Sequence, residues 1–447
     1  MRSVSLALLV FSLAAASLML AAEPKDRRTK VLDDKDTFAE NDIWIYNDLP
    51  KAFAEAKESE KPLLVVFRCV PCEACSKFDQ HLLEKQEELR DVLQEFVCAR
   101  VVYANGLDLS LFDFDFDQSF HAMVLRHDRV VLARYGTRSQ RPEEEDMTVE
   151  GFRATLVEVL ERGQPLRPNL DDLDKQPLER QPRLKTPEEF PSLAGKYTQQ
   201  PDYEGRVVET CIHCHQVRDA QREWYRQQDK PIPDTVLFPQ PLPDVLGLTM
   251  DPRTASRVAS VAPRSLAAKA GLKKGDTIGY INLQPIFSTA DLQWALHTAD
   301  ARAEKPGQAT ALSIGVKERN IELTLELPAG WRRKGDLSWR PTTWELRRMA
   351  FGGMLLVPLS QGERAGLKLG KNAGALLAKH VGQYGDHARA KQAGFEKGDI
   401  IVAVDGKPCP PRETDLLLLA LEKPPGTKIP VTVRRGTRTM DLEMPTQ

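Results

Sequence analysis

The chain has 447 residues, of which 41% are apolar and 28% are charged, and its formal net charge is −2. This composition supports ordinary globular cores and excludes wholesale disorder or a coiled-coil rod. The near-zero charge excludes a generally basic nucleic-acid binder, so we expect no nucleic acid among the partners. Seven cysteines are too few for a disulfide-rich scaffold of this length, so each one needs its own explanation.

The N-terminal segment is almost uninterrupted in its apolar character. Arg2 is followed by an apolar run from Val4 to Leu20, and polar residues resume at Glu23. This pattern predicts a secretory signal peptide over residues 1–22, and therefore an exported protein that works in the periplasm or elsewhere outside the cytoplasm. An uncleaved membrane anchor is the alternative, because roughly 17 apolar residues approach spanning length. A membrane is expected as a partner only in that case.

Residues 38–165 alternate apolar runs with amphipathic stretches, which predicts an α/β domain. A buried strand at 63–67 leads into Arg68-Cys69-Val70-Pro71-Cys72-Glu73-Ala74-Cys75 and then into a helix. The order of strand, Cys-x-x-Cys, helix, strand, hairpin and closing helix resembles the thioredoxin fold, particularly its exported branch.

Two Cys-x-x-Cys spacings overlap in this segment. A thiol at a helix N-terminus has a lowered pKa, because the helix dipole stabilises the thiolate. Counted from the preceding strand, the thioredoxin pattern predicts Cys72 as the attacking thiol and Cys75 as the resolving thiol, with Cys69 able to form an alternative disulfide with Cys72. A static disulfide and a metal site remain open. Thioredoxins place a cis-proline before the hairpin, but residues 119–122 contain none, so either client handling differs or turnover has been lost.

Residues 166–201 are rich in proline and charge, which predicts a stiff, extended linker. A short helical module over 202–245 follows and contains Cys211-Ile-His-Cys-His215. This string matches the attachment signature of c-type haem, with Cys211 and Cys214 as thioether donors and His215 as the iron ligand. Met250 is the nearest downstream methionine and the candidate second metal ligand. The module is short for wrapping a haem, and a plain disulfide or a zinc site are the alternatives.

The C-terminal half contains an internal repeat. The string Ala270-Gly-Leu-Lys-Lys-Gly-Asp-Thr-Ile278 recurs as Ala393-Gly-Phe-Glu-Lys-Gly-Asp-Ile-Ile401. Two duplicated domains are therefore predicted, at 246–330 and 363–447, with a tryptophan-rich connector at 331–362 between them. Both copies resemble bacterial-type PDZ domains.

PDZ grooves add an extended peptide as a strand and hold its carboxylate in a backbone loop. In the first copy, the candidate loop is Leu246, Gly247 and Leu248. In the second copy, 366–369 is a poorer candidate. Such domains often accompany serine proteases, but the chain has no Gly-x-Ser-x-Gly string, so we do not expect a serine protease.

The complete order resembles a family of exported bacterial thioredoxin-like/PDZ proteins, found notably in planctomycete-type bacteria, some of whose members use selenocysteine. The stretches that carry the resemblance are 68–75, 108–115, 211–215, 338–340 and 379–385. The resemblance implies a multidomain architecture, with one α/β thioredoxin-like domain and two α+β PDZ domains joined by the proline-rich linker and the Cys-x-x-Cys-His module. It implies redox chemistry but little about the substrate.

We therefore predict an extracytoplasmic redox protein that exchanges thiols and disulfides, recruits peptide or protein clients through its PDZ grooves, and carries a haem c for electron transfer to a redox partner. The alternative is a non-catalytic PDZ adaptor or redox sensor in which the cysteine motifs are structural. Cys98 and Cys409 are predicted to be lone thiols, Cys98 within a strand and Cys409 in a loop.

Overall fold

The computed structural model describes residues 26–39, 41–70, 76–118, 120–162, 184–254, 256–299, 308–369 and 373–447. The predicted signal peptide at 1–22 and the predicted catalytic residues Cys72 and Cys75 lie outside these ranges. No helix within them is long and apolar enough to cross a membrane.

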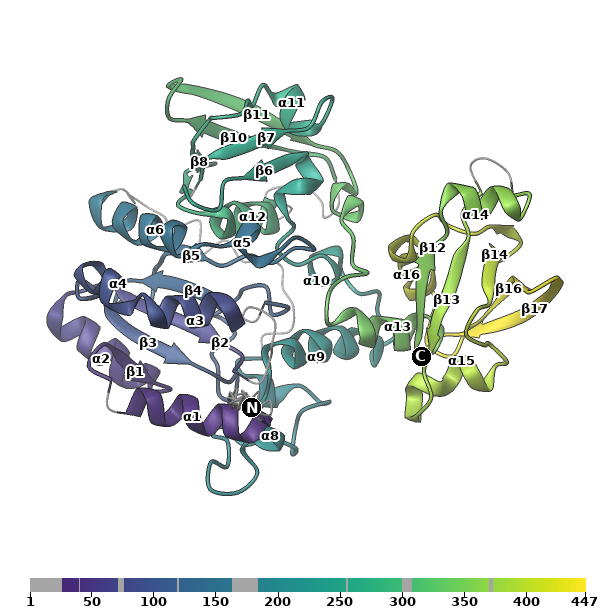
Figure 1. The fold of residues 1–447 in the computed structure, drawn as a ribbon, viewed down its shortest axis with the longest axis horizontal. Coiled ribbons are helices and arrows are strands. Elements are labelled where there is room, and N and C mark those ends of the chain that lie inside the picture. The colour runs from purple at the N-terminus through teal and green to yellow at the C-terminus, as the bar shows by residue number, and fades with distance from the viewer. Residues whose placement is uncertain are drawn as a thin grey trace, which may run out of the picture.

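The first domain is a five-stranded sheet with helices on both faces (Figure 1). Its elements are α1 (Arg27–Ala39), β1 (Trp44–Tyr46), α2 (Leu49–Ser59), β2 (Leu63–Arg68), α3 (Ser76–Glu84), α4 (Gln86–Leu93), β3 (Val97–Val101), β4 (Phe120–Leu125), β5 (Val131–Tyr135), α5 (Glu143–Asp146) and α6 (Val149–Arg162).

The strand order is β1-β3-β2-β4-β5. Strands β1, β3 and β2 run parallel, β4 is antiparallel to β2, and β5 is antiparallel to β4. The central strand β2 is buried at every position, which explains its run of apolar residues.

The predicted linker at 166–201 is not an extended spacer where the structure describes it. The segment from 184 onward forms η2 (Pro187–Glu189) and buries Phe190 and Leu193 in one core of the thioredoxin-like sheet. The backbone N–H of Leu109 donates to the carbonyl of Lys185 at 2.8 Å. The segment packs against the sheet because these two apolar side chains cover a part of it that would otherwise face water.

The predicted module at 202–245 is also part of this domain. It contains α8 (Val207–Thr210), α9 (Cys214–Arg226) and α10 (Asp234–Leu237). Ile212 is fully buried in the same core, and its backbone bonds to Asn105 and Ala104 at 2.6 and 2.8 Å. In Figure 1, helix α9 leads from this domain toward the C-terminal unit.

The first PDZ-like unit packs on the thioredoxin-like domain. Its elements are η3 (Pro243–Leu246), β6 (Leu248–Met250), β7 (Val258–Val261), α11 (Leu266–Ala270), β8 (Ile278–Ile281), β9 (Gln284–Pro285), α12 (Thr289–His297), β10 (Thr310–Val316) and β11 (Ile321–Leu327). The strands form a four-stranded sheet, β11-β10-β8-β9, and a β6–β7 pair.

The packing between these two bodies runs along β5, the edge strand of the first sheet. The carboxylate of Asp291 on α12 accepts the backbone N–H of Arg134 at 3.0 Å, and the Arg134 guanidinium lies 4.0 Å from the Trp294 ring centre. Phe287 enters a core of the thioredoxin-like domain. The contact therefore covers an edge strand that would otherwise be open to pairing with another chain.

The second PDZ unit follows η5 (Trp331–Lys334) and lies to the right in Figure 1. Its elements are α13 (Thr343–Phe351), β12 (Met354–Pro358), α14 (Gln361–Gly366), β13 (Leu376–Val381), η6 (Gly385–Ala388), α15 (Arg389–Gln392), β14 (Ile400–Val404), β15 (Lys407–Pro408), α16 (Glu413–Leu421), β16 (Lys428–Arg435) and β17 (Arg438–Pro445). The sheet order is β12-β13-β14-β16-β17, with β15 on β14.

Two predictions for this unit were wrong. Its boundary lies before 363, because β12 pairs with β13 and α13 packs in the same core. Residues 366–369 are not the carboxylate loop, because 361–366 form helix α14. The matching loop is at Gly353, whose carbonyl accepts the N–H of Gly382, as the carbonyl of Gly247 accepts that of Ala262 in the first unit.

The sequence repeat corresponds to a repeated piece of structure. Asp276 and Asp399 each cap the preceding turn by accepting a backbone N–H, from Lys273 and Glu396 respectively. Each aspartate also pairs with an arginine from the last hairpin of its unit. This shared role explains why the Gly-Asp dipeptide stands out in both copies.

Candidate functional site

The thiol segment begins where β2 ends, and only its first cysteine is described. Cys69 is buried, with 8% of its surface exposed. Its Sγ lies 3.5 Å from Nδ1 of His213, which is the central histidine of the Cys-x-x-Cys-His string. Cys69 and the Cys-x-x-Cys-His string, far apart in sequence, therefore meet at one corner of the thioredoxin-like domain.

His213 is held in place by the start of α9. It is the N-cap residue of that helix, and its backbone N–H donates to the side chain of Gln216 at 2.7 Å. Burial, together with the nearby charges of His215 and Arg27, lowers the pKa of His213 to about 4. The imidazole is therefore neutral near pH 7 and a weak base, so it can share a hydrogen bond with the Cys69 thiol without taking its proton.

A buried ion network supports the start of the thiol segment. The Arg68 guanidinium donates to the carbonyl of Cys69 at 2.6 Å and pairs with Asp79 at 3.0 Å. Asp79 also pairs with Arg100, which in turn pairs with Asp34. Burial would raise the pKa of Asp79, but Arg100 and Arg68 outweigh it and hold the pKa below its ordinary value.

The predicted haem residues do not face a common open surface. Cys211 is buried against Val31 of α1 and Val207 of α8, and burial raises its thiol pKa to about 12. Cys214 is buried in the core of the thioredoxin-like domain instead. His215 is 47% exposed at its side chain and lies 3.7 Å from the carboxylate of Asp219.

Haem attachment needs both thiols at one edge of the macrocycle with the imidazole on its iron, so these residues, as packed, do not fit the group. Met250 does not serve as a second metal ligand beside His215. It lies on β6 in the core of the first PDZ-like unit, whereas His215 is on α9 (Figure 1). Within the described ranges, no group of three or more His, Cys, Asp or Glu residues is arranged to hold a metal ion.

The lone thiols are buried. Cys98 lies within β3, and burial raises its pKa. Cys409 is packed in the core of the second PDZ unit rather than lying in an open loop, and burial raises its pKa to about 12. Neither environment favours a reactive thiolate.

The predicted loop of the first PDZ-like unit lies at the end of η3. Leu246 and Leu248 are buried, and Gly247 has φ 78°, which favours glycine. A side chain there would also collide with Ser265, whose Cβ lies 2.3 Å from the position of an added Cβ. The N–H of Gly247 donates to the carbonyl of Asp244, so this loop has fewer free donors than its sequence suggests.

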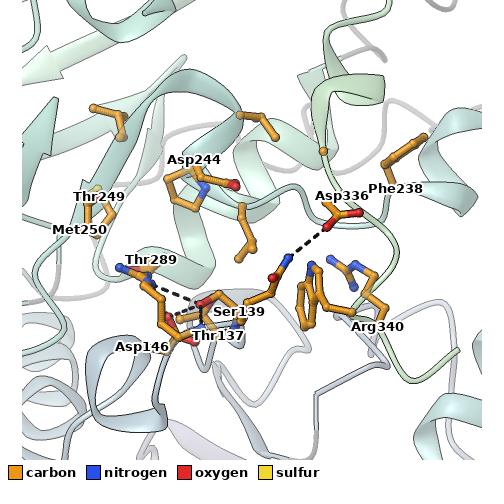
Figure 2. Close-up of a pocket in the computed structure, with 18 of the residues that line it drawn as sticks. Thr137, Ser139, Asp146, Phe238, Asp244, Thr249, Met250, Thr289, Asp336 and Arg340 are labelled. Carbon is orange, nitrogen blue, oxygen red and sulfur yellow. Dashed lines mark hydrogen bonds and ion pairs between the residues drawn. The ribbon is translucent and has the colours of Figure 1, made fainter. Parts of the chain in front are cut away.

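A pocket of about 260 Å³ opens beside this loop. It lies between β6, the first residue of α12, the 137–146 segment of the thioredoxin-like domain and the connector at 335–340 (Figure 2). Within the described residues, β6 pairs only with β7. Its other edge is the one that a PDZ groove offers to an added strand.

The corresponding groove of the second unit is closed. Glu413, the first residue of α16, accepts the backbone N–H of Leu356 on β12 at 2.8 Å. The same carboxylate pairs with Arg347 of α13 at 2.6 Å, and both side chains are buried. The backbone donor that an incoming peptide would use is therefore already satisfied from within.

Sequence reasoning missed the contacts that join the domains. Arg340 is buried and pairs with Asp115 and Asp117 at 2.8 and 3.0 Å. Both partners lie in or next to stretches that carried the family resemblance, 108–115 and 338–340, but nothing in the sequence indicated that they meet. The partners of Cys69 and Glu413 were missed for the same reason.

A thioredoxin-like family model matches residues 44–126, and a PDZ domain model matches residues 386–435. The chain therefore contains a thioredoxin-like domain and a PDZ domain, which indicate redox chemistry and protein binding in general terms. The first PDZ-like unit lies outside both matches.

Two solved structures of the HtrA-type protease AlgW with decapeptide, one of them a variant, show some likeness to the chain. The variant is 16% identical with a TM-score of 0.22, over 42% of this chain and 53% of its own. The other is 13% identical with a TM-score of 0.20, over 32% and 51%. The chain spans about half the length of these structures, and a likeness this low carries no argument. No curated protein matches the chain.

Proposed function

We propose that this protein exchanges thiols with disulfides of client proteins at the corner where Cys69 meets the Cys-x-x-Cys-His string, and that its first PDZ-like unit holds the client. The carrying observation is the 3.5 Å contact between Cys69 Sγ and His213 Nδ1. This contact supports treating the Cys-x-x-Cys-His string as part of the proposed thiol site rather than as a separate electron carrier. The N-terminal apolar segment supports placing this chemistry outside the cytoplasm.

The proposed exchange proceeds in two balanced steps. The thiolate of Cys72 attacks one sulfur of the client disulfide, forming a mixed disulfide and releasing the other client sulfur as a thiolate. Cys75 then attacks the mixed disulfide, which leaves the client with two thiols and the protein with one disulfide. A dithiol donor returns the protein to its reduced form. His213 would assist as a positioning residue, holding the first cysteine of the motif through its hydrogen bond.

Thiol trapping tests this exchange. The full chain carrying Cys75→Ser, incubated with a synthetic peptide disulfide, should accumulate an adduct at Cys72, seen by mass spectrometry. The Cys72→Ser/Cys75→Ser chain is the matched control and should form none there. Absence of the adduct, with a protein disulfide potential below the roughly −300 mV of structural disulfides, would overturn the proposal.

The role of His213 has its own control within the motif. His213→Ala should slow exchange with the same peptide disulfide about fivefold, because it removes a hydrogen bond worth roughly 1 kcal/mol from the first cysteine of the motif. His215→Ala changes the half-exposed neighbouring imidazole and should leave the rate unchanged. Equal rates in both variants would remove His213 from the site.

One observation favours the adaptor alternative, in which the motifs are structural. All the described cysteines are buried, and buried thiols react slowly.

Haem would offer a third use of the motif, so a pyridine haemochrome spectrum of protein made in a haem-attaching host is informative. From the packing of Cys211 and Cys214 we expect no bound haem, and a haem spectrum would contradict that packing argument.

A further inference from the structure

The groove of the first PDZ-like unit is completed by another domain. One wall of the pocket is its own β6, and the opposite wall is the 137–146 segment that follows β5 of the thioredoxin-like sheet (Figure 2). Gln140 of that segment donates to Asp336 of the connector at 3.1 Å. Three separate parts of the chain therefore build a single pocket.

The wall from the thioredoxin-like domain is ordered before any ligand arrives. The carboxylate of Asp146 accepts the backbone N–H of Ser139 at 2.6 Å and its hydroxyl at 2.9 Å. Asp146 also pairs with Arg141 at 2.8 Å. A pre-ordered wall reduces the entropy lost when a flexible chain binds against it.

The same wall contacts the helix that follows the thiol segment. The side chain of Glu143 on α5 accepts the backbone N–H of Phe78 in the first turn of α3, at 2.6 Å. Tyr135, at the end of β5, pairs with Ala122 near the start of β4, and Phe120 pairs with Arg68 at the end of β2. The pocket and the end of β2, after which the thiol segment begins, therefore lie at the same end of the sheet.

The lining of the pocket is acidic. It includes four carboxylates and two guanidinium groups, on Glu145, Asp146, Asp244, Asp336, Arg141 and Arg340. Arg141 is paired with Asp146, and Arg340 is paired with carboxylates outside the lining. Asp336 accepts hydrogen bonds from neutral donors on Gln140, Ser338 and Thr414.

For the other two carboxylates, Glu145 and Asp244, no direct ion pair is found within the described part of the chain; desolvation raises the pKa of the Asp244 carboxyl, and Arg141 and Arg340 act on it only from farther away. The uncompensated charge of the lining is therefore negative. The remaining surface is largely apolar, with Phe238, Leu242 and Trp339 among the lining residues.

We propose that this composite groove binds an extended client peptide that carries a lysine or arginine upstream of an apolar C-terminus. The C-terminal residue would lie at Leu246–Leu248, the chain would add to the open edge of β6, and the basic side chain would reach Glu145 and Asp244. Charge complementarity commits the site to a cationic peptide. The inference rests on the proposed peptide binding by this unit, and it adds a substrate class and a second domain to it.

Synthetic decapeptides with a free C-terminal valine test the inference on the full chain. Each carries a fluorescein label and has lysine, alanine or glutamate at one position, from the third to the eighth residue before the carboxylate. Binding is measured by fluorescence anisotropy. At one or more positions, we expect the lysine peptide to bind at least tenfold more tightly than the glutamate peptide, with a difference that shrinks as NaCl rises.

Neutralising the acidic wall should remove that preference. In the Glu145→Gln/Asp244→Asn chain, the lysine peptide should bind no more tightly than the alanine peptide, whose affinity should not change. Both residues are exposed, so the folded state should tolerate the substitutions. Glu58→Gln, at an exposed carboxylate on α2 outside the pocket lining, is the matched control and should keep the preference.

The outcomes separate this inference from the proposed function. Peptide binding without a preference for lysine, or a preference that survives in the double variant, overturns the composite acidic groove and leaves peptide binding intact. No binding of any peptide overturns both the acidic groove and the proposed client binding by this unit, whereas the proposed exchange is decided by the trapping experiment.

Discussion

The second PDZ unit and the first, PDZ-like unit have similar elements but differ at the first residue of the helix that borders the groove. In the second unit, the first residue of α16 is Glu413, and its carboxylate holds the backbone N–H of Leu356 and the guanidinium of Arg347. In the first unit, the corresponding residue of α12 is Thr289, and the pocket opens between it and Met250. The closed groove therefore has the long, charged side chain of Glu413 at this position, and the open groove has the short, neutral side chain of Thr289.

The neighbours of the two groove helices also differ. Helix α12 packs on the edge strand of the thioredoxin-like domain, whereas α16 packs on α13 of its own unit. The PDZ family model matches the unit whose groove is closed. A PDZ fold therefore does not by itself indicate a free groove. The residues at the strand edge decide whether a peptide can bind.

The closed groove should depend strongly on its buried ion pair. Glu413→Ala leaves the Arg347 guanidinium and the Leu356 N–H buried without their partner, which typically costs about 3–5 kcal/mol of unfolding free energy. Urea unfolding of the full chain measures the lost free energy of unfolding, read from the transition in which the second PDZ unit unfolds.

The matched control for that measurement lies two residues along the same helix. Asp415 pairs with Arg412, and both side chains are 30–39% exposed. Asp415→Ala should therefore cost at most about 1 kcal/mol. Equal effects of the two variants would show that the Glu413 contacts do not hold the groove closed.

A buried histidine of the first unit should make the folded chain less stable in acid. His297 at the end of α12 is buried, and its Nδ1 accepts the N–H of Gln240. Burial, and then the charges of Arg332, Arg218 and Arg134, hold its pKa well below the ordinary value, although Asp113 lies 3.9 Å from its Nε2.

Because the folded protein keeps this histidine neutral, the unfolded chain binds more protons below pH 6.5. Stability is therefore fully present above that pH and falls as the pH drops, by about 2 kcal/mol between pH 6.5 and 5. In His297→Leu this dependence should be smaller by that amount, measured as urea midpoints at several pH values. An identical pH dependence in both chains would assign the loss to other groups, such as the buried His121 and His213.

Closing the open groove should be achievable with one side chain. Thr289→Glu places a carboxylate where Glu413 stands in the second unit, so it should compete for the β6 edge. We expect about a tenfold loss of affinity for a neutral, alanine-containing decapeptide with C-terminal valine, which corresponds to about 1.4 kcal/mol. Fluorescence anisotropy measures it.

Gln308→Glu is the control for the added charge, because it lies on an exposed residue of the same unit outside the pocket lining. Its peptide affinity should match that of the unmodified chain. If the Thr289→Glu chain binds the peptide as tightly as this control, the difference between Thr289 and Glu413 does not decide whether a peptide can enter the groove.

Much of the architecture could be predicted from local patterns. The apolar run at 63–67 became the buried strand β2, and the repeated Gly-Asp turns marked two similar units with Asp276 and Asp399 in the same role. These predictions succeeded because periodicity and turn chemistry act over a few residues. The start of the second unit was misplaced because β12 acquires its role through pairing with β13, more than ten residues later, and α13 through packing on the distant helix α16.

The candidate site could likewise be predicted only in part. The sequence by itself determined which residue types are present: the cysteine motifs, the Cys-x-x-Cys-His spacing, and the glycine at 247 that a positive φ requires.

Only the tertiary structure decided how these residues are used, since burial and long-range contacts depend on which surfaces pack together. It placed His213 beside Cys69, buried Cys211 and Cys214 in separate clusters, and set Glu413 across one groove while leaving the other open. The physical reason is that a side chain gains its pKa, its partner and its access to water from neighbours that local sequence does not specify.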